Sequence, residues 1–257
     1  MPFARCLLLI SIFLGLLPLA SQAQVEVKEI KTRPDVTVRF LYAKAENPVA
    51  SVILFAGGFG TLGLFPNGTM RYESYTPTAV SLFVQQGISV LLPDVPSDRS
   101  TLNKFRNTEE HAQDNAALMA FLKQQANVPV WAIGHSNGAL SAAAFSALLQ
   151  DKGPHGVVLM SATTKAPFNI SSAHPVFLTP LDQIKMPVLI VHNTLDPCPA
   201  NPYTGVALIT VELKSAKKVA HFPIEAGGSG GACNGLHRFI GVEEQVTKQV
   251  ADWIKAN

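Results

Sequence analysis

The segment Gly134-His135-Ser136-Asn137-Gly138 decides the fold, because it joins a buried strand to a helix. The run 128–133 before it is short, apolar and rich in β-branched and aromatic residues, which favours a strand. The run 139–145 after it consists largely of good helix formers. A serine at such a hinge lies in a strained turn that exposes its hydroxyl, and flanking glycines let strand and helix approach closely. The pattern predicts that Ser136 is a nucleophile; a tight turn that happens to contain serine is the alternative.

Strands and helices are predicted to alternate along the rest of the chain. Strands are expected at 25–30, 37–42, 51–56, 88–92, 156–160, 187–192 and 217–221, and further helices at 78–86, 108–126 and 242–255. We expect the first two strands to be edge strands and the fourth to end at Pro93. The alternation implies an α/β fold with a mostly parallel central sheet and helices on both faces. The connection 162–186 is too short for an independent lid domain, so only a minimal lid is expected.

Residues 1–23 have the features of a cleaved export signal. Arg5 precedes the almost wholly apolar run 6–19, and small residues follow at 21–23. The apolar run is too short for a stable membrane span, although a retained anchor helix is the alternative. We therefore expect one domain, residues 24–257, in a secreted or periplasmic location and without a stable membrane anchor.

Composition narrows the range of partners. The chain of 257 residues has a formal net charge of +2, with 20 basic and 18 acidic residues, and 47% of its residues are hydrophobic. This balance argues against nucleic acid as a partner, which requires a concentrated basic face. The apolar content suits one α/β domain with a large core.

Cys198 and Cys233 are the two cysteines that remain after the signal segment. In an oxidising compartment an isolated pair is most simply a disulfide, with two free buried thiols as the alternative. A metal site is not expected, because neither cysteine has a second ligand at zinc spacing.

Four segments carry a resemblance to a known family: 134–138, the glycine-rich turn 56–60, 192–196 and 235–239. Through them the mature chain resembles the α/β-hydrolase family, and within it small secreted carboxylesterases of the dienelactone-hydrolase and chlorophyllase/polyester-hydrolase kind. A serine nucleophile needs a base and an orienting acid, which in this architecture follow in the order serine, acid, histidine.

Asp196 and His237 fit the roles of acid and base. Asp196 follows a predicted strand by a few residues, and His237 lies between the last strand and the last helix. Both are therefore expected at the carboxyl end of the sheet, beside Ser136. A Cys198–Cys233 bond would tie the acid loop to the base loop and preorganise the three side chains.

Other histidines and acids are weaker candidates. His221 is expected to be buried in its strand, His192 to have a packing or hydrogen-bonding role, and His135 to point away from the partner of Ser136 in a supporting role. Surface positions are expected for His111, His155 and His174. Asp182 precedes its strand and falls at the wrong end of the sheet, whereas Asp94 is a minor competitor.

An oxyanion hole also requires two backbone donors. The N–H groups of Asn137 and Phe59 are predicted, with that of Gly58 as a competitor. Gly58, Phe59, His135 and Phe168 are the expected substrate-binding residues, although a core position is the commoner fate of a phenylalanine.

The glycines at 58, 60 and 63 also fit a dinucleotide-binding pattern, G-x-G-x-x-G. Such a site would need a helix to begin there, and Pro66 and Gly68 follow instead. No cofactor is therefore expected.

These expectations lead to a secreted serine hydrolase that cleaves carboxylic esters through an acyl-enzyme intermediate. Its partner would be a small-molecule or polymeric ester. An amidase, peptidase or thioesterase would use the same three residues, and an exported binding module without activity is the alternative from another class.

Overall fold

The computed structural model of the chain describes residues 24–72 and 74–257, so the predicted signal segment lies outside the described residues. The strands are β1 (Gln24–Arg33), β2 (Val36–Lys44), β3 (Ala50–Phe55), β4 (Ile88–Pro96), β5 (Val130–His135), β6 (Gly156–Met160), β7 (Val188–Asn193) and β8 (Val219–Ile224). The helices are α1 (Tyr75–Gln85), α2 (Glu109–Gln125), α3 (Gly138–Leu149), α4 (Gly205–Glu212) and α5 (Glu243–Ala256). Short 3₁₀ turns are η1 (Gln150–Lys152), η2 (Val176–Leu178), η3 (Leu181–Gln183) and η4 (Gly235–Arg238).

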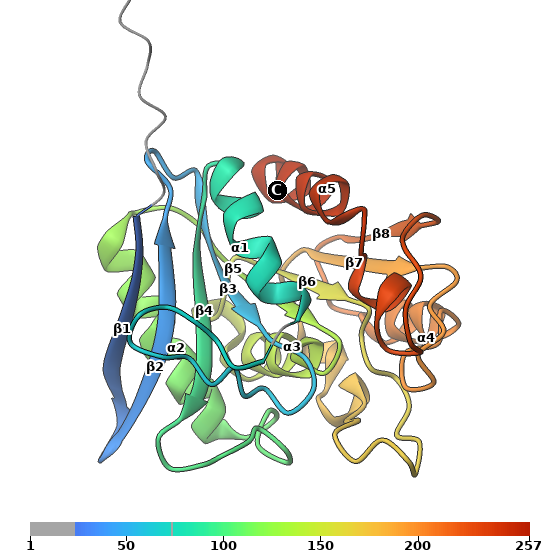
Figure 1. The fold of residues 1–257 in the computed structure, drawn as a ribbon, viewed down its shortest axis with the longest axis horizontal. Helices are drawn as coiled ribbons and strands as arrows, with labels where there is room; N and C mark the ends of the chain where they lie inside the picture. The colour runs from blue at the N-terminus through green and yellow to red at the C-terminus, as the bar shows by residue number, and fades with distance from the viewer. Residues whose placement is uncertain (1–23, 73) are drawn as a thin grey trace, which may run out of the picture.

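The strands form one sheet in the order β1-β2-β4-β3-β5-β6-β7-β8 (Figure 1). β2 is antiparallel to both of its neighbours, and every other adjacent pair, from β4 to β8, is parallel. The central strands β3, β5, β6 and β7 are buried along their whole length. Such burial is typical of parallel strands that are covered on both faces. The predicted α/β class with a mostly parallel sheet is confirmed.

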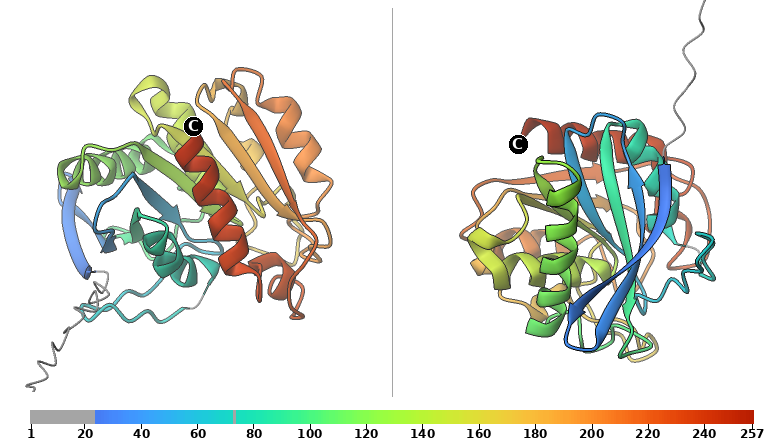
Figure 2. Two further views of the ribbon diagram at one scale, coloured as in Figure 1. Left: turned by 90° about the horizontal axis from the view of Figure 1, so that it is seen from above. Right: turned by 90° about the vertical axis from the view of Figure 1, so that its left-hand side faces the viewer.

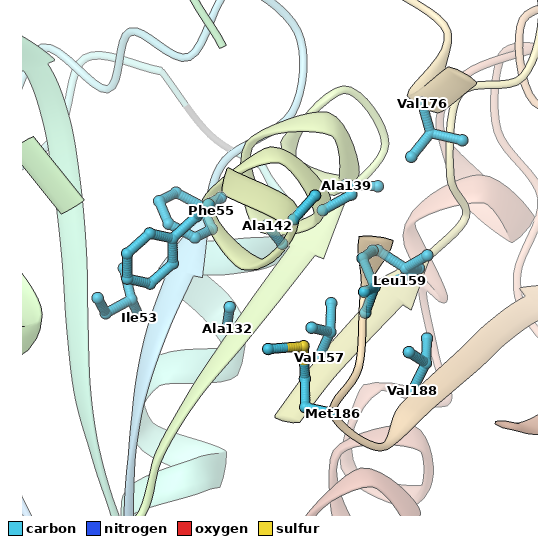
Figure 3. Close-up of a cluster of buried hydrophobic side chains, with 14 of the residues drawn as sticks. Ile53, Phe55, Ala132, Ala139, Ala142, Val157, Leu159, Val176, Met186 and Val188 are labelled. Carbon is cyan, nitrogen blue, oxygen red and sulfur yellow. The ribbon is translucent and has the colours of Figure 1, made fainter. Parts of the chain in front are cut away.

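Helices cover both faces of this sheet (Figure 2). On one face α2, α3 and α4 pack over a core that contains Ala132 of β5 and Ala142 of α3, both of which are labelled in Figure 3. On the other face α1 and α5 pack over a second core, which contains Trp131 of β5, Phe83 of α1 and Val250 of α5. Because adjacent residues of a strand point to opposite faces, Trp131 and Ala132 belong to different cores.

Two strands differ from the sequence-based expectation. The edge position predicted for 37–42 is wrong, because β2 pairs with β1 on one side and with β4 on the other. β4 also continues through Pro93 to Pro96. Its parallel pairing with β3 ends at Leu91, and the later residues pair only with β2. A proline is tolerated there because no ladder on the β3 side needs its missing N–H.

Helix α4 was not predicted from the sequence. Its apolar side chains are spread around the helix: Val206 and Ile209 are buried, whereas Leu208 and Val211 are more than half exposed. No amphipathic period therefore marks the segment. Among the helices that the structure describes, none is long and apolar enough to cross a membrane.

The connection 162–186 contains only the turns η2 and η3. It therefore adds no separate layer above the sheet, and the expectation of a minimal lid is confirmed.

The start of α3 is packed directly against the ends of β5 and β3, and two glycines make this possible. A Cβ atom at Gly134 would lie 2.2 Å from the carbonyl oxygen of Gly138, and one at Gly138 would lie 2.1 Å from that of Phe55. Carbon and oxygen atoms do not approach this closely without a covalent bond. The glycines of the 134–138 segment therefore set the position of Ser136 between them.

We expect Gly138→Ala to lower the free energy of unfolding by about 3 kcal/mol, because the added methyl group meets backbone of β3 that has no room to move. Denaturant unfolding followed by circular dichroism measures this change. Gly231→Ala is the matched control, since a Cβ there would find no atom closer than 3.8 Å. Equal stability of the two variants would contradict the packing argument.

Candidate active site

Ser136 occupies the turn between β5 and α3 in a conformation that few residues other than glycine adopt. Its φ is +56°, in the left-handed region where a side chain is strained. Its neighbours His135 and Asn137 are buried, whereas Ser136 itself is partly exposed. The strained turn predicted from the sequence is therefore present, and it brings the serine to the surface.

Asp196 and His237 come from two loops at the same end of the sheet. Asp196 follows β7, and His237 lies in η4 between β8 and α5. Nδ1 of His237 lies 2.8 Å from Oδ2 of Asp196, and both side chains are buried. This hydrogen bond leaves Nε2 of His237 as the ring nitrogen for proton exchange. The structure thus brings together the acid and the histidine that the sequence order indicates.

The carboxyl group of Asp196 is ionised at neutral pH. Burial alone would raise its pKa, but hydrogen bonds from His192 and His237 lower the pKa to about 2. Oδ1 accepts a further hydrogen bond from the N–H of Cys198 at 2.9 Å. A buried carboxylate held in this way stabilises positive charge on the imidazole that it contacts.

His135 lies against His237, so the expectation that it points away is wrong. The two ring centroids are 4.9 Å apart, and Nε2 of His135 lies 2.9 Å from the carbonyl oxygen of His237. Burial lowers the pKa of His135 to about 3, so the ring is neutral and donates from Nε2. The hydroxyl of Ser161 donates to the same carbonyl at 3.1 Å. Both groups hold the backbone of His237 in place, which fits a supporting role.

Two further histidines lie on β7 and β8. Nε2 of His192 lies 2.9 Å from the carbonyl oxygen of Asn201 and 3.4 Å from Oδ2 of Asp196. His192 therefore has the hydrogen-bonding role expected of it. His221 lies within β8, as expected, but is half-buried rather than fully buried.

The surface position predicted for His111 is wrong. Its ring is buried between Phe55 and Phe105, and burial lowers its pKa to about 3. The first turn of α2 is acidic and polar, so nothing in the local sequence marks position 111 as inward-facing. His155 is exposed and His174 is partly exposed.

The competing acids have other contacts. Oδ1 and Oδ2 of Asp94 accept hydrogen bonds from the backbone N–H groups of Leu62 and Leu64, at 2.8 and 2.7 Å. Asp94 therefore shapes the loop after β3. Asp182 is an exposed residue of η3. In the described part of the chain, neither carboxylate forms a hydrogen bond with a histidine.

A cavity of about 570 Å³ opens where these loops meet. Ser136 and His237 both line it, together with the predicted pocket residues Gly58, Phe59 and His135. Many other lining residues carry small hydroxyl side chains: Thr61, Ser74, Ser100, Thr101, Thr163 and Ser172.

The structure does not place Phe168 in this cavity. The side chain of Phe168 is fully exposed, whereas Ile170 and Ala173 of the same segment line the wall. The large aromatic side chains that line the cavity are those of Phe59, which was predicted to do so, and Tyr72. Both are about half exposed.

The loop after β3 lies against the serine. A Cβ at Gly57 would lie 2.9 Å from Cβ of Ser136, and Gly58 has φ of +55°. No hydrogen bond within the described residues occupies the backbone N–H of Phe59 or of Asn137. Both amides belong to residues of the cavity wall. Their use as oxyanion donors remains a prediction.

The dinucleotide pattern at 58–63 has no helix behind it. The first helix to follow is α1, which begins at Tyr75, so the phosphate-binding geometry of that pattern is missing. No group of three or more potential metal ligands occurs among the described residues.

The predicted disulfide between Cys198 and Cys233 is present. Cys198 follows Asp196 by two residues, and Cys233 precedes His237 by four. The bond therefore ties the acid loop to the histidine loop, and both cysteines line the cavity.

Sequence reasoning missed two side chains next to the site. Nδ2 of Asn137 donates to the carbonyl oxygen of Gly58 at 3.1 Å, and its Oδ1 accepts from the N–H of His174 at 3.0 Å. The guanidinium group of Arg106 is buried beneath the loop 56–58. The elbow pattern specifies only the backbone of Asn137, and an isolated arginine in a polar loop matches no pattern.

Comparison with solved structures places this architecture among known proteins. A dienelactone hydrolase from Anabaena variabilis superposes with a TM-score of 0.62 and 15% identity, over 91% of this chain and 98% of its own. An esterase from Pyrococcus furiosus has a TM-score of 0.67 and 18% identity, over 91% of both chains. An acylaminoacyl peptidase from Pyrococcus horikoshii has a TM-score of 0.63 and 14% identity, over 92% of this chain and 42% of the peptidase.

No family model and no curated protein matches the amino-acid sequence. At identities this low, the likeness concerns the path of the backbone and not the substrate. These three structures, together with the order of strands and helices, establish that the chain has the α/β-hydrolase fold.

Proposed function

We propose that this chain is an exported serine hydrolase that cleaves carboxylic esters, with Ser136 as nucleophile, His237 as base and Asp196 as the orienting acid. One observation carries the proposal. A serine in a strained strand–helix turn lines the same cavity as a histidine whose Nδ1 is held at 2.8 Å by a buried carboxylate. This is the set of groups that activates a hydroxyl for attack on a carbonyl carbon.

In the first step Oγ of Ser136 attacks the ester carbonyl while Nε2 of His237 accepts the hydroxyl proton. The carbonyl becomes a tetrahedral oxyanion, for which the N–H groups of Phe59 and Asn137 are the proposed donors. Collapse of this intermediate breaks the bond to the alcohol, which takes its proton from His237. Asp196 stabilises the imidazolium form of His237 throughout.

In the second step water attacks the acyl-enzyme with His237 again as base. The carboxylic acid leaves, and Ser136 recovers its proton. The reaction needs no cofactor, because every proton and electron pair is supplied by the ester, the water and the three side chains.

Export is part of the proposal, on two grounds. Residues 1–23 read as a cleaved signal, and the disulfide between Cys198 and Cys233 requires an oxidising compartment to persist. The mature enzyme would act in a secreted or periplasmic location.

Ester specificity is proposed over amide and thioester cleavage because the cavity is open beside a minimal lid, which suits small or polymeric esters. The acylaminoacyl peptidase comparison shares only the fold, so an amide substrate is the competing proposal within the same chemistry. Parallel assays with ester, amide and thioester forms of one acyl group separate these activities.

The mature chain, residues 24–257, should be labelled by a fluorophosphonate probe at Ser136, because only an activated serine reacts with it. Peptide mass spectrometry locates the label. Ser100 is an internal control: it lines the same cavity and is more exposed than Ser136, but it does not lie in a strained strand–helix turn. An unlabelled chain would instead favour a binding module without activity, and a label on Ser100 would refute Ser136 as the nucleophile.

A further inference from the structure

Arg106 is a buried cation without an acidic partner. Its side chain lies in the segment between β4 and α2 and is 2% exposed. In the described part of the chain no carboxylate forms an ion pair with it, and burial lowers its pKa to about 9. The guanidinium is therefore still charged at neutral pH. Because a buried charge without a counter-ion is costly, its location calls for a functional explanation.

The guanidinium contacts the loop that lines the cavity beside Ser136. Its Nη2 donates to the carbonyl oxygens of Ala56 at 3.0 Å, Gly58 at 3.2 Å and Gly57 at 3.5 Å. These are three successive peptide units. Its Nη1 donates to Oγ of Ser141 on α3, the helix that begins at the nucleophile turn, at 2.8 Å.

Ser141 and a neutral histidine complete the arrangement. Oγ of Ser141, which accepts from Arg106, also forms a hydrogen bond with Nε2 of His111, 3.0 Å away. Gly60 leaves the space that the guanidinium needs, because a Cβ there would lie 2.9 Å from Nη2. The site is thus built around the cation from both the loop and the helix.

The peptide unit that joins Gly58 to Phe59 is the important one. Its oxygen accepts from Arg106 and also from Nδ2 of Asn137 at 3.1 Å. Its N–H is that of Phe59, one of the proposed oxyanion donors. Positive charge at the oxygen end of a peptide unit polarises it and strengthens the donor at the other end. Arg106 also donates to the carbonyl oxygen of Gly57, which belongs to the peptide unit that carries the N–H of Gly58.

We propose that Arg106 is a positioning residue of the oxyanion hole, which holds the loop 56–59 and polarises its amides toward the developing negative charge. The inference rests on the proposed function. Among the described residues the cation has no counter-ion in the resting protein, and it gains one, through the intervening peptide units, when the oxyanion forms. Such an interaction is stronger in the transition state than in the ground state and so acts on kcat.

The test compares two variants. Arg106→Met removes the positive charge, whereas Arg106→Lys keeps the charge but loses the forked pair of donors, Nη1 and Nη2, of the guanidinium group. With p-nitrophenyl butyrate, we expect kcat of the Met variant to fall about tenfold to a hundredfold, less than the loss of a whole oxyanion donor. KM should stay within about threefold. The Lys variant should recover part of the loss. The inhibition constant of phenylboronic acid, whose tetrahedral adduct places an oxygen in the hole, should rise in parallel with the loss in kcat.

Arg33→Gln is the matched control. Arg33, at the end of β1, forms ion pairs with Asp98 and Asp114. Its guanidinium group lies over the ring of Phe105, the residue before Arg106. Its loss should reduce stability and leave kcat and boronate affinity unchanged. A merely structural role for Arg106 would give the same pattern, and that result would overturn the inference.

The remaining outcomes are also decisive. An active wild type together with a folded Met variant of unchanged kcat refutes the role of Arg106 alone. If the wild-type protein shows no ester hydrolysis that is lost in Ser136→Ala, the proposed function is refuted, and the role of Arg106 is refuted with it. If Arg106→Met does not fold, Arg106→Lys decides, since loss of the fork must still lower kcat and boronate affinity together.

Discussion

Ser136→Ala is expected to lower kcat for p-nitrophenyl esters by about 10⁶-fold while KM changes little. In the proposed mechanism the serine hydroxyl oxygen is the protein atom that forms a covalent bond to the substrate, and alanine lacks it. The proposed oxyanion donors and the cavity wall stay in place, so ester binding and a small residual rate over that in water should be retained. Initial rates across a substrate concentration series, with enzyme purified under conditions that exclude carry-over, measure the loss.

The fold should survive this change. Ser136 is strained at φ of +56°, and alanine occupies the same backbone conformation with one polar atom fewer, so the thermal midpoint should move by only a few degrees. Ser146→Ala on α3, the helix that follows Ser136, is the matched control. Its hydroxyl donates to the carbonyl of Ala142 within α3, away from the cavity. Turnover by Ser136→Ala equal to that of this control would remove the proposed mechanism.

The parts of the molecule that follow from local sequence could be predicted. Two apolar runs predict the strand 130–135 and the helix that follows it. The two glycines between these runs predict the tight turn that joins strand to helix. Asp196 and His237 could be ranked above their competitors because the carboxyl ends of parallel strands meet at one edge of the sheet. The disulfide was predictable because only two cysteines follow the predicted signal segment, and they have few alternatives to pairing.

Features that depend on contacts distant in sequence could not be predicted. His111 and Arg106 are polar residues of a polar segment, and only the packing of α2 and the loop against β3 and α3 buries them. Phe168 is apolar and lies in the connection beside the cavity, yet its side chain faces solvent. From the polarity of the side chains alone, Phe168 would be expected to be buried and His111 and Arg106 exposed, which is the reverse of what the structure shows. The side-chain contacts of Asn137 were hidden for the same reason, since the turn pattern describes only its backbone.

Asp196→Asn is expected to lower kcat by about 10⁴-fold with the structure retained. An asparagine amide at this position donates to Nδ1 of His237 as readily as the carboxylate accepts from it. The proton of the ring then moves to Nε2, the nitrogen that must accept the proton of Ser136. Loss of the negative charge also removes the stabilisation of the imidazolium. Asp182→Asn, an exposed acid outside the cavity, is the matched control and should keep wild-type activity.

The pH dependence of the unfolding free energy provides a second comparison between wild type and Asp196→Asn. The pKa of Asp196 is lowered from 3.8 to about 2 in the folded chain. A carboxyl group with a lowered pKa stabilises the folded state above its unfolded pKa, and this contribution is lost as the pH falls toward 2. The unfolding free energy of wild type should therefore exceed that of Asp196→Asn most at pH 5–7, and the difference should narrow below pH 4. A difference that is constant from pH 7 to pH 2.5 would show that Asp196 is not held as an ionised acid by His237 and His192. In that case the loss of activity would need a cause other than the charge on this carboxylate.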